Sequence, residues 1–75
     1  MKEYWIDIKK QPLPTSGTVI VSVTRREPIA PVAFTSVVRC DEIGPMDSYG
    51  DVYMYAKEIT HWMELPKPML PTDFN

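Results

Sequence analysis

Cys40 and His61 are the side chains on which covalent chemistry would centre, because each is the only residue of its type in the chain. Nucleophilic catalysis requires a reactive thiolate, a base beside it and a third group that orients the base. Asp41 and Glu42 directly follow Cys40, and their negative charge would raise the pKa of the thiol, the opposite of what a reactive cysteine needs. We therefore interpret Cys40 as unreactive. We interpret His61 as a strand residue that hydrogen-bonds a neighbour or water, with a contact at a binding surface as the alternative.

Metal and phosphate chemistry find no support in the spacing of the other polar residues. One cysteine and one histidine cannot supply the three or four protein ligands of a zinc site. The acidic segment from Asp41 to Asp51 lacks the spacing of an EF-hand, and the three glycines are too scattered for a phosphate-binding loop. The sequence predicts no catalytic residue, no metal and no cofactor, and hence no enzyme. A minimal hydrolase built on Cys40 and His61 is the weakest alternative.

The length and charge of the chain limit the remaining classes. Its 75 residues predict one domain, residues 1–75, whose core supplies roughly 3–5 kcal/mol. A single cysteine excludes a disulfide within the chain, which leaves good packing or association with another chain as the source of stability. A net charge of -2 does not favour a nucleic-acid partner. No apolar run is long enough to span a membrane, and an unpaired cysteine without a signal peptide indicates the cytoplasm.

The elements that must position these side chains are short, because eight prolines interrupt the chain. Strands are predicted over residues 4–8, 18–24, 32–38, 52–55 and 59–65. The clearest is 18–24, in which six of seven residues are β-branched, with Val19, Val21 and Val23 facing the core. We expect a mainly β fold, a small antiparallel meander of four to five strands. An exposed loop is predicted from Asp41 to Asp51, and an extended proline-rich tail over 66–75.

The stretch from Tyr55 to Met63 fits two patterns. Tyr55, Ile59, Trp62 and Met63 lie at the spacing of a helical stripe, whereas Ile59, His61 and Met63 also alternate as in a strand. A helix here would hold nine residues, would lack an N-cap and would end against a proline. We favour the strand, with Trp62 on the face opposite Ile59 and Met63, and allow one helical turn near Ala56.

The two ends of the chain resemble a family of small phage and prophage proteins that is classed only as a domain of unknown function. The residues concerned are Trp5-Ile6-Asp7-Ile8, Pro12-Leu13-Pro14, Gly17 to Val21 and the closing run from Ile59 to Pro68. Members of the family close with V-T-H-W-M-P-L-P-E-P-P, and this chain departs from that motif at Glu64. The resemblance implies a mobile-element origin and no known activity. It also implies that Trp5 and Trp62 are structural.

The function is therefore expected to lie in the middle of the chain, which the resemblance does not cover. The predicted partner-binding residues are Asp41, Glu42, Asp47, Tyr49, Asp51, Tyr53 and Tyr55. We expect a protein-binding accessory factor that is encoded by a phage and modulates or inhibits a host defence or replication protein in the bacterial cytoplasm. The alternative is a small module that binds single-stranded nucleic acid through Tyr53, Tyr55 and nearby arginines. A homodimer through a sheet edge is left open.

Overall fold

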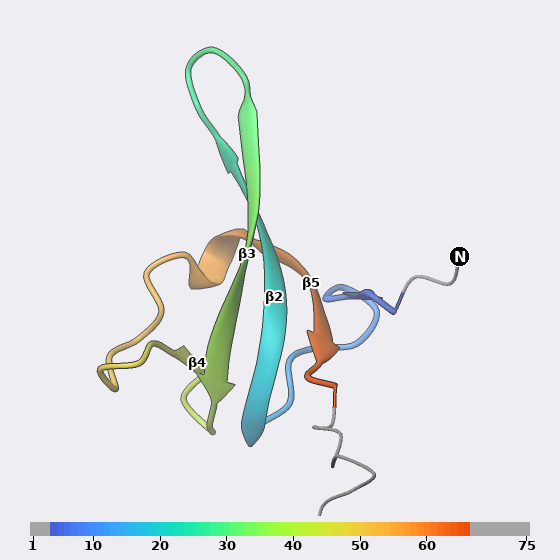
Figure 1. Ribbon diagram of the computed structural model, residues 1–75, viewed down its shortest axis with the longest axis vertical. Helices are drawn as coiled ribbons and strands as arrows, with labels where there is room; N and C mark the ends of the chain where they lie inside the picture. The colour runs from blue at the N-terminus through green and yellow to red at the C-terminus, as the bar shows by residue number, and fades with distance from the viewer. Residues whose placement is uncertain (1–3, 67–75) are drawn as a thin grey trace, which may run out of the picture.

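The computed structural model describes residues 4–66, which form one five-stranded antiparallel sheet (Figure 1). The mainly β prediction is confirmed, and so is the helical turn near Ala56. The elements are β1 (Ile6–Asp7), β2 (Gly17–Arg26), β3 (Pro31–Cys40), β4 (Pro45–Met46), the 3-10 helix η1 (Ala56–Glu58) and β5 (Ile59–Glu64). Within the described part of the chain, no helix is long and apolar enough to cross a membrane.

The strand order is β1-β5-β2-β3-β4. β2, β3 and β4 follow one another as a meander, but β5 returns across the molecule and lies between β1 and β2. β2 is thus the central strand. It pairs with β3 over ten residues on one side and with β5 on the other. Its predicted alternation is confirmed, since Val19, Val21 and Val23 are all buried.

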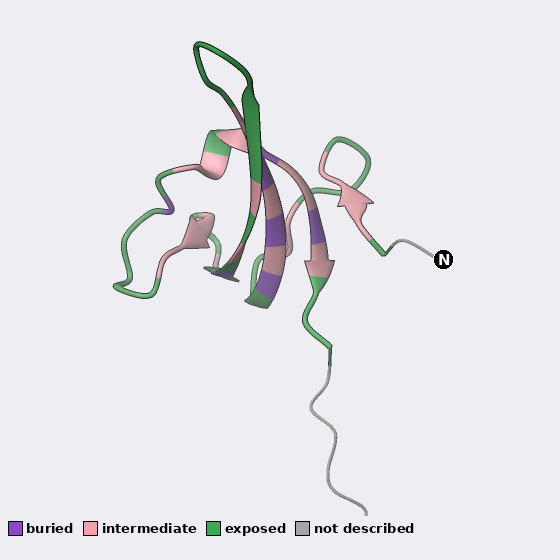
Figure 2. Cartoon of the chain, turned by 45° about the horizontal axis from the view of Figure 1, so that its top comes forward, coloured by how far each residue is buried: buried purple, intermediate pink, exposed green. Residues whose placement is uncertain are grey.

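The two faces of the sheet differ in burial, and buried residues alternate with less buried ones along β2 (Figure 2). On the face that we call the core face, the β2 valines pack with Val38 and Trp62. Loops add to this layer, because Leu13 packs on it from the segment before β2 and Tyr53 from the segment after β4. On the opposite face, which we call the open face, the side chains include Thr18, which is exposed, and Ile20, which is half-buried.

A bulge in β5 decides which face its apolar side chains take. Ser22 pairs with His61, but the next residue of β2, Val23, pairs with Ile59, so that Thr60 is the extra residue. The hydroxyl of Thr60 donates a hydrogen bond to the Ser22 carbonyl oxygen at 3.3 Å. Ile59 and Trp62 consequently both lie buried on the core face. The prediction that they occupy opposite faces was wrong, because regular alternation does not hold through a bulge.

Two further sequence predictions were wrong between β3 and η1. The segment predicted as a strand, residues 52–55, holds one isolated bridge between Val52 and Met46 and then turns. The predicted loop contains β4, which pairs with the end of β3 through Cys40↔Pro45. Pro45 is tolerated because Asp41 and Gly44 exchange backbone hydrogen bonds, which leaves the next pair without any. The predicted tail, apart from Pro66, lies outside the described residues.

Candidate protein-binding surface

The segment after β3 begins with a turn that is closed by the Asp41 carboxylate. Asp41 and Gly44 exchange two backbone hydrogen bonds of 3.2 Å. The Asp41 Oδ1 atom also accepts hydrogen bonds from the backbone N–H groups of Ile43, at 2.8 Å, and Gly44, at 3.1 Å. Gly44 has a φ of 140°, a conformation that a residue with a Cβ atom rarely adopts. The carboxylate therefore fixes the turn that carries Glu42 and Ile43, both exposed.

Asp47 organises a second turn in the same way. Its Oδ1 atom accepts hydrogen bonds from the N–H groups of Tyr49, at 2.8 Å, and Asp51, at 3.0 Å. The backbone N–H of Asp47 donates to the Asp51 carbonyl oxygen at 2.8 Å, and that of Gly50 donates to the Asp47 carbonyl oxygen at 3.1 Å. This network leaves the side chains of Tyr49 and Asp51 exposed while holding their backbone in place.

These turns and the chain that follows them present large apolar side chains to solvent. Ile43 is 80% exposed, Tyr49 89%, Val52 60% and Met54 78%. We call these four side chains the loop surface. Single exposed apolar residues are normal, but several on one preorganised segment are typical of a contact surface, and Tyr is enriched at interface hot spots. Ile43, Val52 and Met54 were not among the predicted site residues.

The charge of this segment has one sign. Four of the ten acidic residues of the chain lie between positions 41 and 51, and no lysine or arginine occurs between Cys40 and Lys57. The rest of the chain then holds six acidic and eight basic residues, so the segment carries a formal charge of -4 against +2 elsewhere. Its field favours a basic partner over an acidic one.

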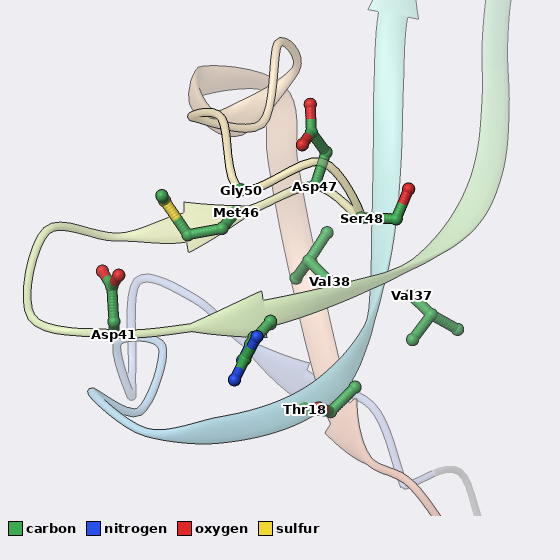
Figure 3. A pocket seen from close by; sticks show the side chains of 9 residues that line it. Thr18, Val37, Val38, Asp41, Met46, Asp47, Ser48 and Gly50 are labelled. Carbon is green, nitrogen blue, oxygen red and sulfur yellow. The ribbon is translucent and has the colours of Figure 1, made fainter.

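A hollow of about 460 Å³ lies between the Asp47 turn and the open face of the sheet (Figure 3). Thr18 of β2 and Arg39 of β3 contribute to its floor, and Met46 of β4 and Asp47 line it from the loop side. The hollow thus adjoins the loop surface and combines a methionine with both signs of charge. It can receive a partner's side chain.

The two remaining predicted contact residues turn inward. Tyr53 is buried in the core cluster. The ring of Tyr55 packs edge-on against Phe34, with centroids 5.3 Å apart, and edge-on against Tyr53, at 5.7 Å. The Arg25 guanidinium lies 4.9 Å from the Tyr55 ring centroid and is held there by Glu58, whose Oε2 accepts a hydrogen bond from its Nε at 3.2 Å. The two tyrosines fasten the loop to the core face.

The two tryptophans differ in burial, and the Cys–His pair is divided by the sheet. Trp62 is buried, and its Nε1 donates a hydrogen bond to the Gln11 carbonyl oxygen at 2.9 Å, whereas Trp5 is half-buried. Cys40 belongs to the buried cluster, while His61 lies on the open face opposite Ser22. Burial raises the pKa of the Cys40 thiol, and the adjacent Asp41 carboxylate raises it further. The geometry therefore gives a Cys40–His61 pair no means of acting together.

One row of side chains on the open face was missed by sequence reasoning. The register aligns Asp7, His61 and Ser22 on three neighbouring strands, although they are far apart in the sequence. These are the residue types of a Ser-His-Asp triad, but their hydrogen bonds lead elsewhere. His61 Nδ1 is 2.9 Å from the Thr60 hydroxyl, and the Asp7 carboxylate accepts from the N–H of Lys9 at 2.9 Å. The arrangement is a cross-strand row and lacks the contacts of a triad.

Comparison with known proteins places this chain in a family without an assigned activity. A model of a protein family of unknown function, DUF551, matches residues 4–69. The chain therefore belongs to that family. The match extends through the middle of the chain, including the loop surface, and so is wider than the two ends on which the sequence resemblance rested. Neither the curated proteins nor the solved structures contain a match.

Proposed function

We propose that this member of the family is a protein-binding accessory factor that recognises a partner through the loop surface. In this proposal the gene belongs to a phage or prophage, and the partner is a host defence or replication protein in the bacterial cytoplasm. The resemblance of the chain termini to small phage proteins supports that origin. The role is to modulate or inhibit the partner by occupying part of its surface.

The observation that carries the proposal is the combination of exposed apolar side chains with uncompensated carboxylates on one preorganised segment. Ile43 and Tyr49 stand on turns that the carboxylates of Asp41 and Asp47 hold closed. A segment ordered before binding loses less conformational entropy on association. Tyr49 offers a large ring at low entropic cost, and the exposed Glu42 and Asp51 add negative charge to the same segment.

The charge of the segment supports a proposal about the chemistry of the partner. Carboxylates at the rim of an interface increase the association rate with a basic surface and discriminate against an acidic one. We therefore propose a partner with an apolar depression bordered by lysines or arginines. Binding should weaken as salt is added, because the rim charges are screened at ordinary ionic strength.

The experiment is a quantitative pull-down from a bacterial lysate with three immobilised proteins: wild type, Tyr49→Ser and Tyr4→Ser. Tyr4 is the matched control, because it is also an exposed aromatic residue but lies near the opposite edge of the sheet. Wild type and Tyr4→Ser should retain the same protein in stoichiometric amount, and Tyr49→Ser should lose at least about tenfold, as expected for a hot spot. Equal retention by all three proteins would contradict the proposed surface.

The nucleic-acid alternative receives less support from the positions of the tyrosines. Base stacking requires an open ring face. Tyr53 is buried, and the Tyr55 ring has Arg25 over it and Phe34 at its side. A mobility-shift assay with single strands tests this alternative, for which binding that strengthens at low salt would be the positive result.

A further inference from the structure

The outer edge of β3 carries backbone groups without partners. Asp41 and Gly44 form a hydrogen-bonded pair, and Cys40↔Pro45 is therefore a pair without such bonds. Residues that direct their N–H and C=O groups to one side of an antiparallel strand recur at every second position. The backbone N–H and C=O groups of Arg39 consequently point toward β4. Those of Val37, Thr35 and Ala33 point to the same side.

β4 ends before it reaches those three residues. It pairs only with Arg39 and Cys40, and the strand pairings and backbone hydrogen bonds among residues 4–66 give Ala33, Thr35 and Val37 no partner at this edge. All three residues are exposed. The hairpin of β2 and β3 also extends beyond the rest of the sheet, so that its upper edge stands clear of the other strands (Figure 1). Three donors and three acceptors are therefore available in a row.

The edge also lacks the features with which proteins prevent strand pairing. Exposed edges are normally blunted by lysine, by inward-pointing charges or by proline within the strand. The sequence from Val32 to Val38 contains no charged residue and no proline, and it is rich in β-branched side chains. Pro31 precedes this stretch and does not interrupt it.

We propose that this edge binds a second copy of the same chain, with the two β3 strands antiparallel about a two-fold axis. Such pairing is self-complementary, because residues that alternate along one copy place their donors opposite the acceptors of the other. An uncharged strand meets no like-charge repulsion from its copy. The core has eight buried side chains among residues 4–66, and a chain with a single cysteine forms no internal disulfide, so association is one of the few further sources of stability for so small a domain.

The proposed dimer is closed. The other edge strand of the sheet, β1, is two residues long, so it offers no comparable ladder on which a third copy could add. β4 limits the pairing to the part of β3 before Arg39. This proposal does not rest on the protein binding proposed above, and its measurements test it separately, although Val37 lines both this edge and the hollow beside Asp47.

Backbone amide hydrogen exchange, followed by NMR on the wild-type chain alone, tests the dimer residue by residue. The amides of Phe34, Ser36 and Val38 are directed toward β2 and should exchange slowly at every concentration. The amides of Ala33, Thr35 and Val37 should be slow in concentrated protein and accelerate by about tenfold or more on roughly hundredfold dilution. Fast exchange of these three amides at both concentrations would overturn the proposal.

Sedimentation of two variants provides the second test. Thr35→Lys places a charge on the proposed contact and should convert a concentration-dependent dimer into a monomer. Thr18→Lys adds the same charge to the same open face, but on the central strand, and should leave the dimer intact. A dimer that persists in Thr35→Lys overturns the proposal. A wild-type chain that stays monomeric by itself, and whose β3 edge pairs only with a strand of another protein, also overturns it. The exchange measurement on the wild type remains decisive if Thr35→Lys does not fold.

Discussion

Replacing one valine on each face of the sheet tests whether the fold has a single core layer. Val21 is 0% exposed at the centre of β2, and Val37 is 57% exposed on the open face of β3. Val21→Ala and Val37→Ala remove the same two methyl groups from strand positions. The intrinsic preference of valine for strands is lost in both variants. The difference between them therefore reports mainly burial.

The magnitude follows from the methyl groups. At about 0.8 kcal/mol per buried carbon, Val21→Ala loses about 1.6 kcal/mol of transfer free energy, and the residual cavity raises the loss to about 2–3 kcal/mol. Val37 has less than half of its surface buried, so its loss should stay below about 1 kcal/mol. A domain of this length has an unfolding free energy of about 4–11 kcal/mol, so the first change is a large fraction of the total.

Urea unfolding followed by circular dichroism measures both variants, and thermal unfolding provides a second reading. Val21→Ala should lower the melting temperature by about 10–20 °C and Val37→Ala by a few degrees. Equal losses would refute the one-sided sheet, since they would mean that the open face is buried in solution to the same extent as the core face. Both measurements belong at low protein concentration, where any self-association contributes least.

Three further predictions concern the residues around the loop. Cys40→Ala should remove part of the fall in the free energy of unfolding at alkaline pH, because folding raises the pKa of the Cys40 thiol. The thiol's contribution to that free energy is complete below the ordinary thiol pKa of about 8.5 and is lost as pH rises through the higher pKa of the folded state. An unchanged difference in unfolding free energy between wild type and Cys40→Ala across that range would contradict the shift. A double-mutant cycle of Arg25→Ala and Tyr55→Leu should give a coupling of about 0.5–1 kcal/mol from the stacked guanidinium, whereas additive effects would show that the contact contributes nothing. Asp47→Ala should accelerate amide exchange in the second turn severalfold, and Asp47→Asn should do so much less, because asparagine retains the acceptor oxygen. The same acceleration in the two variants would assign the effect to the lost charge instead.

The sequence was most informative where local preference and tertiary environment agree. β2 was predicted from its β-branched residues, and Val19, Val21 and Val23 are buried as expected. The structure extends it to Gly17–Arg26, because the hairpin with β3 continues beyond the core. Features that depend on pairing between distant residues were not predictable. The bulge at Thr60 follows from the register between β2 and β5, and β4 exists through its pairing with the end of β3.

The same distinction applies to the candidate site. The glycines and carboxylates of the acidic segment predicted a loop, which is confirmed outside β4, where Asp41 and Asp47 accept hydrogen bonds from the backbone of their own turns. The exposure of Val52 and Met54 was not predictable, because apolar residues next to tyrosines resemble a strand. Tyr53 is buried for a related reason: its position depends on how the loop crosses the core face, which no local pattern records.

Site-specific photo-crosslinking at the loop surface tests the central claim, binding through this segment, most directly. A photoreactive phenylalanine analogue replaces Tyr49 in one protein and Tyr4 in another, because both side chains are exposed and both substitutions keep an aromatic ring. Irradiation in a bacterial lysate, followed by mass spectrometry of the adducts, identifies what lies against each position. We predict a single covalent adduct with one basic protein from position 49 and none with that protein from position 4. The same adduct from both positions, or no adduct from position 49, would contradict the proposed surface.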